Sequence, residues 1–154
     1  MSLLAVDLGL RTGLALYNPQ GRLVWYRSHN FGSQARLKRG AHGILKDIPE
    51  LDILVLEGGG TLADLWANEG VKRGLDVHTI TAEIWRKRLL LPRQQTSGAK
   101  AKRHADQRAR KIIQWSNAPR PTSLRHDAAE AILIGLWGVL NAGWLTELPA
   151  ELKA

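Results

Sequence analysis

Two carboxylates occur in this sequence where a carboxylate is costly. Asp7 follows the apolar residues Leu3–Val6, and Glu57 ends a second apolar run that begins at Ile53. Such runs predict strands buried on both faces of a sheet, where a charged group needs a cation or a hydrogen-bond donor beside it. Because neighbouring strands lie about 4.8 Å apart, the two carboxylates share one site if these strands pair. Like charges at that distance raise each other's pKa unless a cation lies between them.

Two more carboxylates begin the last strong helical pattern. Asp127 and Glu130 are three positions apart, so both lie on one face of the helix, and the alanines between them let that helix approach a sheet closely. An acidic residue in a first turn also interacts favourably with the helix dipole, which is a simpler role for Asp127. The simpler role for Asp7 is to accept backbone hydrogen bonds from the glycine-rich turn that follows it. Four acids from three elements favour a shared site.

Four carboxylates together are typical ligands of a hard metal ion. Oxygen ligands in a chain without cysteine favour Mg²⁺ or Mn²⁺ over zinc. Two such ions, roughly 3.5–4 Å apart, can activate a water molecule and stabilise the leaving oxygen of a phosphodiester. The chain carries 22 Lys and Arg against 14 Asp and Glu, a net charge of +8. This charge favours a polyanionic partner, with nucleic acid before an acidic membrane surface.

Composition also limits the class of protein. A length of 154 residues suits one domain with a real core. No apolar run is long enough to span a membrane, and the opening residues lack the features of a signal peptide. The absence of cysteine excludes disulfides and thiolate metal sites and fits a reducing compartment. We therefore expect a cytoplasmic protein without a membrane partner.

Strand and helix patterns alternate along the chain and must position these acids. The opening run and its two successors predict three antiparallel strands, and a later strand reached after a crossing helix is parallel to its neighbour. The sequence therefore predicts an α/β fold: a mixed five-stranded sheet, with three antiparallel N-terminal strands and then parallel strands, flanked by helices. We expect strands at 3–7, 14–17, 22–29, 52–57 and 76–80, helices at 33–46, 61–73, 82–89, 102–115 and 124–141, and a polar basic loop at 93–103.

The acidic positions resemble the motifs of RuvC-type Holliday junction resolvases, nucleases of the RNase H-like superfamily. The resemblance covers about residues 3–140 and rests on the order of elements and on three motifs: Asp7-Leu-Gly-Leu-Arg-Thr-Gly, Leu-Val-Leu-Glu57 and His126-Asp127-Ala-Ala-Glu130-Ala-Ile. It implies a nuclease domain over 1–142, followed by a tail over 143–154 that we expect to be loosely attached.

The resemblance implies the chemistry as well. Asp7, Glu57, Asp127 and Glu130 would be catalytic residues that bind two divalent ions, Mg²⁺ or Mn²⁺. A metal-activated water would cleave the DNA strand and leave a 5′-phosphate and a 3′-hydroxyl.

The resemblance also implies partners. The substrate would be branched DNA, a four-way junction, cut by a homodimer because two symmetric nicks need two active sites. The basic loop ahead of the penultimate helix would bind the DNA, with Lys100 or Lys102 near the scissile phosphate and Arg103 beside them.

The sequence departs from the family pattern at two places. Glu130 stands where the family usually has aspartate. The segment from Gly58 to Leu75 is shorter than the family's, and three glycines replace an aromatic residue that probes the junction and a region that builds the dimer contact. Trp66 is a candidate substitute for that aromatic residue, although a helix tryptophan at this spacing is more typical of a core.

These departures support nuclease chemistry better than junction specificity. A related nuclease that acts on flaps, nicks or RNA–DNA hybrids stays an alternative. So does a nucleic-acid-binding protein without catalysis, although four intact acids argue against it.

Overall fold

Five strands form one mixed sheet in the computed structural model, which describes residues 1–153. Their order across the sheet is β3-β2-β1-β4-β5. The first three strands are antiparallel, whereas β4 pairs in parallel with both β1 and β5. The predicted fold class is confirmed. The strands are β1 (Ser2–Asp7), β2 (Arg11–Tyr17), β3 (Leu23–Asn30), β4 (Leu51–Glu57) and β5 (Asp76–Ile80).

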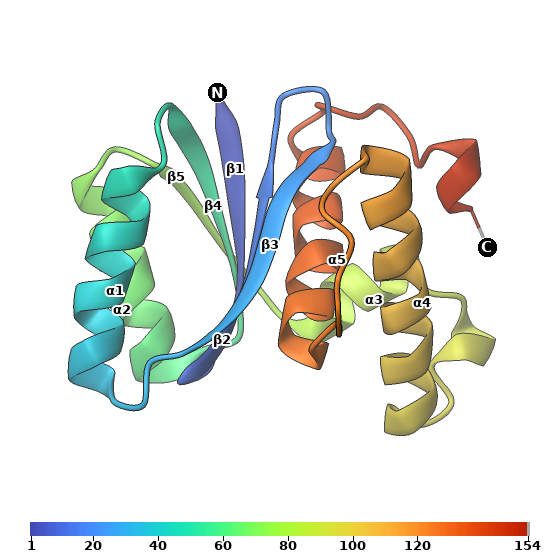
Figure 1. The fold of residues 1–154 in the computed structure, drawn as a ribbon, viewed down its shortest axis with the longest axis horizontal. Coiled ribbons are helices and arrows are strands. Elements are labelled where there is room, and N and C mark those ends of the chain that lie inside the picture. The colour runs from blue at the N-terminus through green and yellow to red at the C-terminus, as the bar shows by residue number, and fades with distance from the viewer. Residues whose placement is uncertain (154) are drawn as a thin grey trace.

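Helices cover both faces of this sheet (Figure 1). On one face lie α1 (Gln34–Asp47) and α2 (Gly60–Lys72), and on the other lie α3 (Ala82–Leu89), α4 (Gly98–Ser116) and α5 (His126–Asn141). The doubly buried strands β1, β2 and β4 therefore have an apolar cluster on each side.

Small residues bring α5 directly onto the sheet. A Cβ atom added at Gly135 would lie 2.2 Å from the Tyr17 ring, and one added at Gly138 would lie 2.9 Å from Leu3. The Tyr17 hydroxyl also donates a hydrogen bond to the carbonyl of Ile132 in the middle of α5. The helix is buried along most of its length and crosses β1 and β2, which places its first turn at the carboxyl end of β1 (Figure 1).

The helix α4 begins earlier than expected, so the predicted loop over 93–103 is wrong for residues 98–103. The hydroxyl of Ser97 caps this helix by accepting the Lys100 N–H at 3.1 Å. A stripe of small residues, Ala101, Ala105 and Ala109, faces the core. Alanine gives a weak apolar signal beside so many basic residues, although it is the best helix former.

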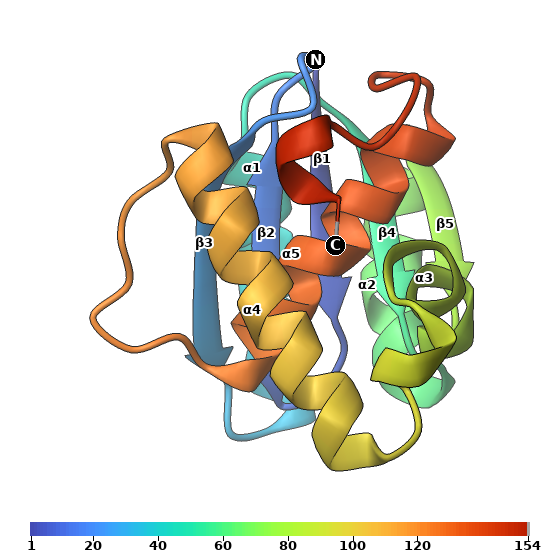
Figure 2. The ribbon, with the colours of Figure 1, turned by 90° about the vertical axis from the view of Figure 1, so that its right-hand side faces the viewer.

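The segment after α5 packs on the helical layer instead of hanging loosely (Figure 2). Leu152 is buried in the core, and the guanidinium of Arg108 donates to its carbonyl. Arg108 itself is buried. The division between a domain over 1–142 and a tail over 143–154 stays a prediction, and Ala154 lies outside the described residues. None of the helices within 1–153 is long and apolar enough to cross a membrane.

Candidate active site at the carboxyl end of the central strands

The pairing of β1 with β4 brings two of the predicted acids together. The two strands run in parallel, and Asp7 is the register partner of Glu57 at their carboxyl ends. Each side chain is partly buried at that edge. The predicted pairing of their strands is thus confirmed.

Gly13 explains how α5 brings Asp127 to the same place. Gly13 pairs with Asp7 across β1 and β2. A Cβ atom added at Gly13 would lie 1.9 Å from the backbone carbonyl oxygen of Asp127, so only glycine allows the first turn of α5 to approach the strand this closely. The turn before β2 is closed by the buried Thr12, whose hydroxyl donates to the carbonyl of Gly9 at 2.7 Å. Gly13, the last residue of the first motif, therefore allows α5 to pack closely against β2.

Glu130 lies one turn further along α5 and is only 5 % exposed. Two basic side chains meet its carboxylate: Nε2 of His126 at 2.7 Å and Nη2 of Arg86 at 3.5 Å. His126 comes from the preceding turn of α5, whereas Arg86 comes from α3. These contacts hold the Glu130 carboxylate at the buried side of the cluster.

The pKa of Asp7 responds to the charges of the other three predicted acids. Burial raises the pKa of Asp7 from 3.8 to about 9, assisted by the charge of Glu130, by a hydrogen bond with Glu57 and its charge, and by the charge of Asp127. Burial also raises the pKa of Glu57, although the hydrogen bond with Asp7 opposes the rise. Without a cation, both shifts favour a protonated carboxyl group in the Asp7–Glu57 pair.

The donor set suits a hard divalent ion, because it consists of carboxylate oxygens whose mutual repulsion a cation would relieve. The side chains are not yet gathered around a common point: within residues 1–153, no three His, Asp or Glu side chains already form such a group. Asp127 accepts hydrogen bonds from the Ser28 hydroxyl at 2.9 Å and from its neighbour's N–H at 2.8 Å. Side-chain rotation at Asp127 and Glu130 would therefore accompany binding of an ion.

Three neighbours of the acids were not identified from the sequence. The guanidinium of Arg86, in a basic run of α3, points to Glu130 and acts to lower the pKa of Glu57. His126 begins the third motif, and the structure places it against Glu130. Ser28 contacts Asp127 from β3, a strand whose pattern gives no sign of that contact.

The basic residues predicted to bind nucleic acid lie in the first turns of α4. Lys102 and Arg103 are exposed and Lys100 is half-buried. Figures 1 and 2 show this end of α4 at the same end of the molecule as the first turn of α5 and the carboxyl end of β1. Their placement is compatible with the predicted role, which stays a prediction.

A search of solved structures finds the same architecture in a known protein. The chain superimposes on T. thermophilus RuvC, solved in complex with a Holliday junction substrate, with a TM-score of 0.65 over 93% of this chain and 96% of that one. The chain has the RuvC fold. Sequence identity is 16%, and neither a family model nor a curated protein matches the chain.

The RuvC fold here lacks an aromatic residue after the glutamate of β4. Gly58 and Gly60 adopt positive φ angles of 127° and 75°, and a Cβ atom at Gly58 would lie 3.2 Å from the Leu8 side chain. Trp66 is fully buried between α2 and the sheet, so its interpretation as a core residue is confirmed. The segment therefore holds no exposed tryptophan that reaches a ligand.

Proposed function

We propose that this chain is a divalent-metal-dependent endonuclease that cleaves branched DNA, with the four-way junction as its substrate. The observation that carries the proposal is the placement of carboxylates from β1, β4 and α5 near the carboxyl end of β1, in a chain of net charge +8. Burial, assisted by the charges of the other three acids, raises the pKa of Asp7 to about 9 there. A half-buried cluster of like charges destabilises a fold. A bound cation would offset the repulsion between these carboxylates.

The RuvC fold supports the same proposal, because T. thermophilus RuvC was solved with a Holliday junction. Asp7, Glu57, Asp127 and Glu130 would hold two Mg²⁺ or Mn²⁺ ions. Bound there, such ions lower the pKa of a water molecule and stabilise the leaving oxygen. The hydrolysis adds water across the P–O3′ bond, which leaves a 5′-phosphate on one product and a 3′-hydroxyl on the other.

The protein's own groups have separate tasks in this proposal. Asp7 gives up its proton when it becomes a ligand, because a carboxylate binds a cation only in its charged form. His126 and Arg86 position Glu130, and the Ser28 hydroxyl orients Asp127. Lys100, Lys102 and Arg103 bind the phosphates of the cleaved strand. Removal of any orienting contact would loosen a ligand without removing it.

A homodimer is part of the proposal for a four-way junction, because paired symmetric nicks need two active sites. The short segment from Gly58 to Leu75, with glycines at 58–60, replaces the region that would build the dimer contact. It therefore favours a second candidate with the same chemistry. This is a nuclease of the RuvC fold that acts as a monomer on another structured nucleic acid, such as a flap or a nick.

A third candidate, a nucleic-acid-binding protein without catalysis, is favoured by one observation. Arg86 already partly compensates the charge of Glu130, and His126 contacts the same carboxylate. One arginine and one histidine against four acids still leave the acids in excess, which is unfavourable in a site meant only to bind a polyanion.

Labelled DNA substrates test these candidates together. An immobile four-way junction, a nicked duplex and a plain duplex are incubated with the protein in Mg²⁺ or in EDTA, alongside Asp7→Asn. Paired symmetric nicks in the junction alone, which require both Mg²⁺ and Asp7, are the expected result. Metal-dependent cutting without a junction preference would favour the second candidate. Tight binding without cutting in Mg²⁺ or Mn²⁺ would overturn the proposal.

A further inference from the structure

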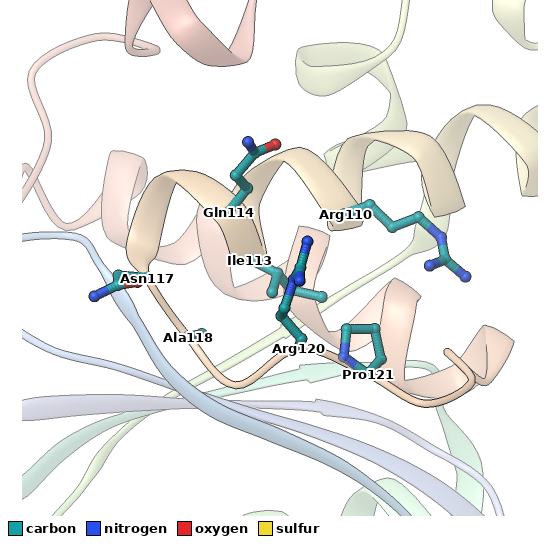
Figure 3. Close-up of a pocket in the computed structure, with 7 residues that line it drawn as sticks. All are labelled: Arg110, Ile113, Gln114, Asn117, Ala118, Arg120 and Pro121. Carbon is teal, nitrogen blue, oxygen red and sulfur yellow. The ribbon is translucent and has the colours of Figure 1, made fainter.

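Two hollows lie on either side of the segment that connects α4 to α5, residues 117–125. The larger, of about 630 Å³, lies between α4 and this connection (Figure 3). The smaller, of about 380 Å³, lies between the connection and β3. Arg120 and Pro121 line both hollows, and we call the two adjoining hollows together the arginine track. Figure 3 shows the Arg120 side chain reaching from the connection toward α4, where Arg110 and Gln114 are exposed.

The track is positively charged. Its lining contains four exposed arginines and no acidic residue: Arg27, Arg110, Arg120 and Arg125. Arg110 forms an exposed ion pair with Asp106, with 2.9 Å between Nε and Oδ2. Arg27 lies over the ring of Trp25 at 4.2 Å, a contact that leaves its charge in place. Among residues 1–153, Arg120 and Arg125 form no ion pair.

The track begins at the acid cluster. Ser28 lines the smaller hollow, and its hydroxyl donates to Asp127 at 2.9 Å. The connection is also held to β3 by Tyr26, whose hydroxyl donates a hydrogen bond to the carbonyl of Pro119. Burial raises the pKa of Tyr26, and the charge of Arg110 opposes the rise.

We propose that this arginine track binds the phosphate backbone of a duplex arm that leads away from the cleavage site. The proposal rests on the proposed nuclease function, because the track starts at the carboxylates that would cut. Arginine, serine and amide side chains are the groups that bind phosphates. Tyr26 is the one aromatic residue in the lining and its hydroxyl is engaged, so the track offers little of the stacking surface that single strands require.

Binding measurements in EDTA test the track apart from any cleavage. The ligands are a fluorescent 30-base-pair duplex, a single strand of one of its sequences and an immobile four-way junction. The variant Arg110→Gln/Arg120→Gln is compared with Arg36→Gln/Arg39→Gln, which removes the same charge from exposed positions of α1 on the opposite face. Affinity is measured by anisotropy over a range of salt concentrations.

We expect the track variant to bind duplex and junction about 10- to 60-fold more weakly at 0.1 M salt, with a salt slope reduced by about 2. The α1 variant should bind like the wild type. Equal losses in both variants, or none in the track variant, would overturn the track. Single-strand binding tighter than duplex binding, lost in the track variant, would overturn the duplex as its occupant.

Failure of the track is distinguishable from failure of the nuclease proposal. A wild-type protein that cuts junctions in Mg²⁺ while both variants bind alike would retain the nuclease and lose the track. If the wild-type protein cuts nothing, but the track variant alone binds duplex more weakly than the wild type, the nuclease proposal fails and the track is retained as a binding site.

Discussion

Two carboxylates of this protein meet the same kinds of partner with opposite consequences. On the face covered by α1 and α2, Glu69 contacts His42 at 2.8 Å and Arg73 at 3.1 Å. Although burial acts to raise it, these hydrogen bonds lower the pKa of Glu69. At the end of β1, Glu130 also contacts a histidine and an arginine, but its neighbours include three further carboxylates. The single acid Glu69 joins two helices through its histidine and arginine. At Glu130 the acids outnumber the one arginine and one histidine, and we propose that cations bind there.

The largest effect that would break this comparison is on cleavage. Asp7→Asn removes a carboxylate from the cluster and should lower the rate of junction cleavage by at least about 10³-fold, because an ion that stabilises the transition state loses a ligand. Glu69→Gln removes a carboxylate of the other kind and should leave the rate unchanged. Single-turnover rates with Mg²⁺ measure both. Equal cleavage rates for Asp7→Asn and the wild type would contradict the difference in role between the acid cluster and Glu69.

The next effect concerns the close approach that gathers the acids. Gly13→Ala would place a Cβ against the carbonyl of Asp127, so we expect a loss of roughly 3 kcal/mol in the free energy of unfolding. Gly43→Ala is the matched control in α1. No atom lies within 4 Å of its added Cβ, and alanine in a helix should gain up to about 1 kcal/mol. Urea denaturation measures both, and a harmless Gly13→Ala would contradict the packing described.

The two regions should also respond to pH in opposite directions. The pKa of Asp7 is raised from 3.8 to about 9, so the metal-free protein loses stability as pH rises between these values. Asp7→Asn should therefore raise the free energy of unfolding at pH 8 by roughly 1–3 kcal/mol.

The pKa of Glu69 is lowered, so its contribution is present above about 4.5 and is lost as pH falls. Glu69→Gln should lower stability at pH 8 by less than about 1 kcal/mol. Thermal unfolding in EDTA between pH 3 and 9 measures both variants. A stability difference between Asp7→Asn and the wild type that does not grow with pH would contradict the coupling of the four acids.

The smallest effect sharpens the role of an orienting contact. Ser28→Ala removes the hydroxyl that holds Asp127, so cleavage should slow by about 3- to 10-fold while folding stability changes little. Ser33→Ala removes a comparable hydroxyl, the cap of α1, and should lower stability by about 1 kcal/mol without slowing cleavage. The reverse pattern would show that Ser28 serves the fold alone.

Much of this molecule follows from its sequence, for physical reasons that differ between regions. Strands such as β1 and β4 are apolar on both faces, so their place in the sheet and the pairing of Asp7 with Glu57 were predictable. The partners Ser28 and Arg86 come from β3 and α3, and only the folded chain brings them to the acids. The start of α4 was missed because its buried stripe is alanine.

Manganese binding tests the central claim most directly, because it asks whether the four carboxylates form a cation site without requiring a substrate. The loss of the free Mn²⁺ signal in electron paramagnetic resonance is measured for the wild type, Asp7→Asn and Glu69→Gln. We predict two bound ions per chain in the wild type and in Glu69→Gln, and at most one, bound at least about 10-fold more weakly, in Asp7→Asn. A wild type that binds no Mn²⁺, or an Asp7→Asn variant that binds it equally well, would contradict the account.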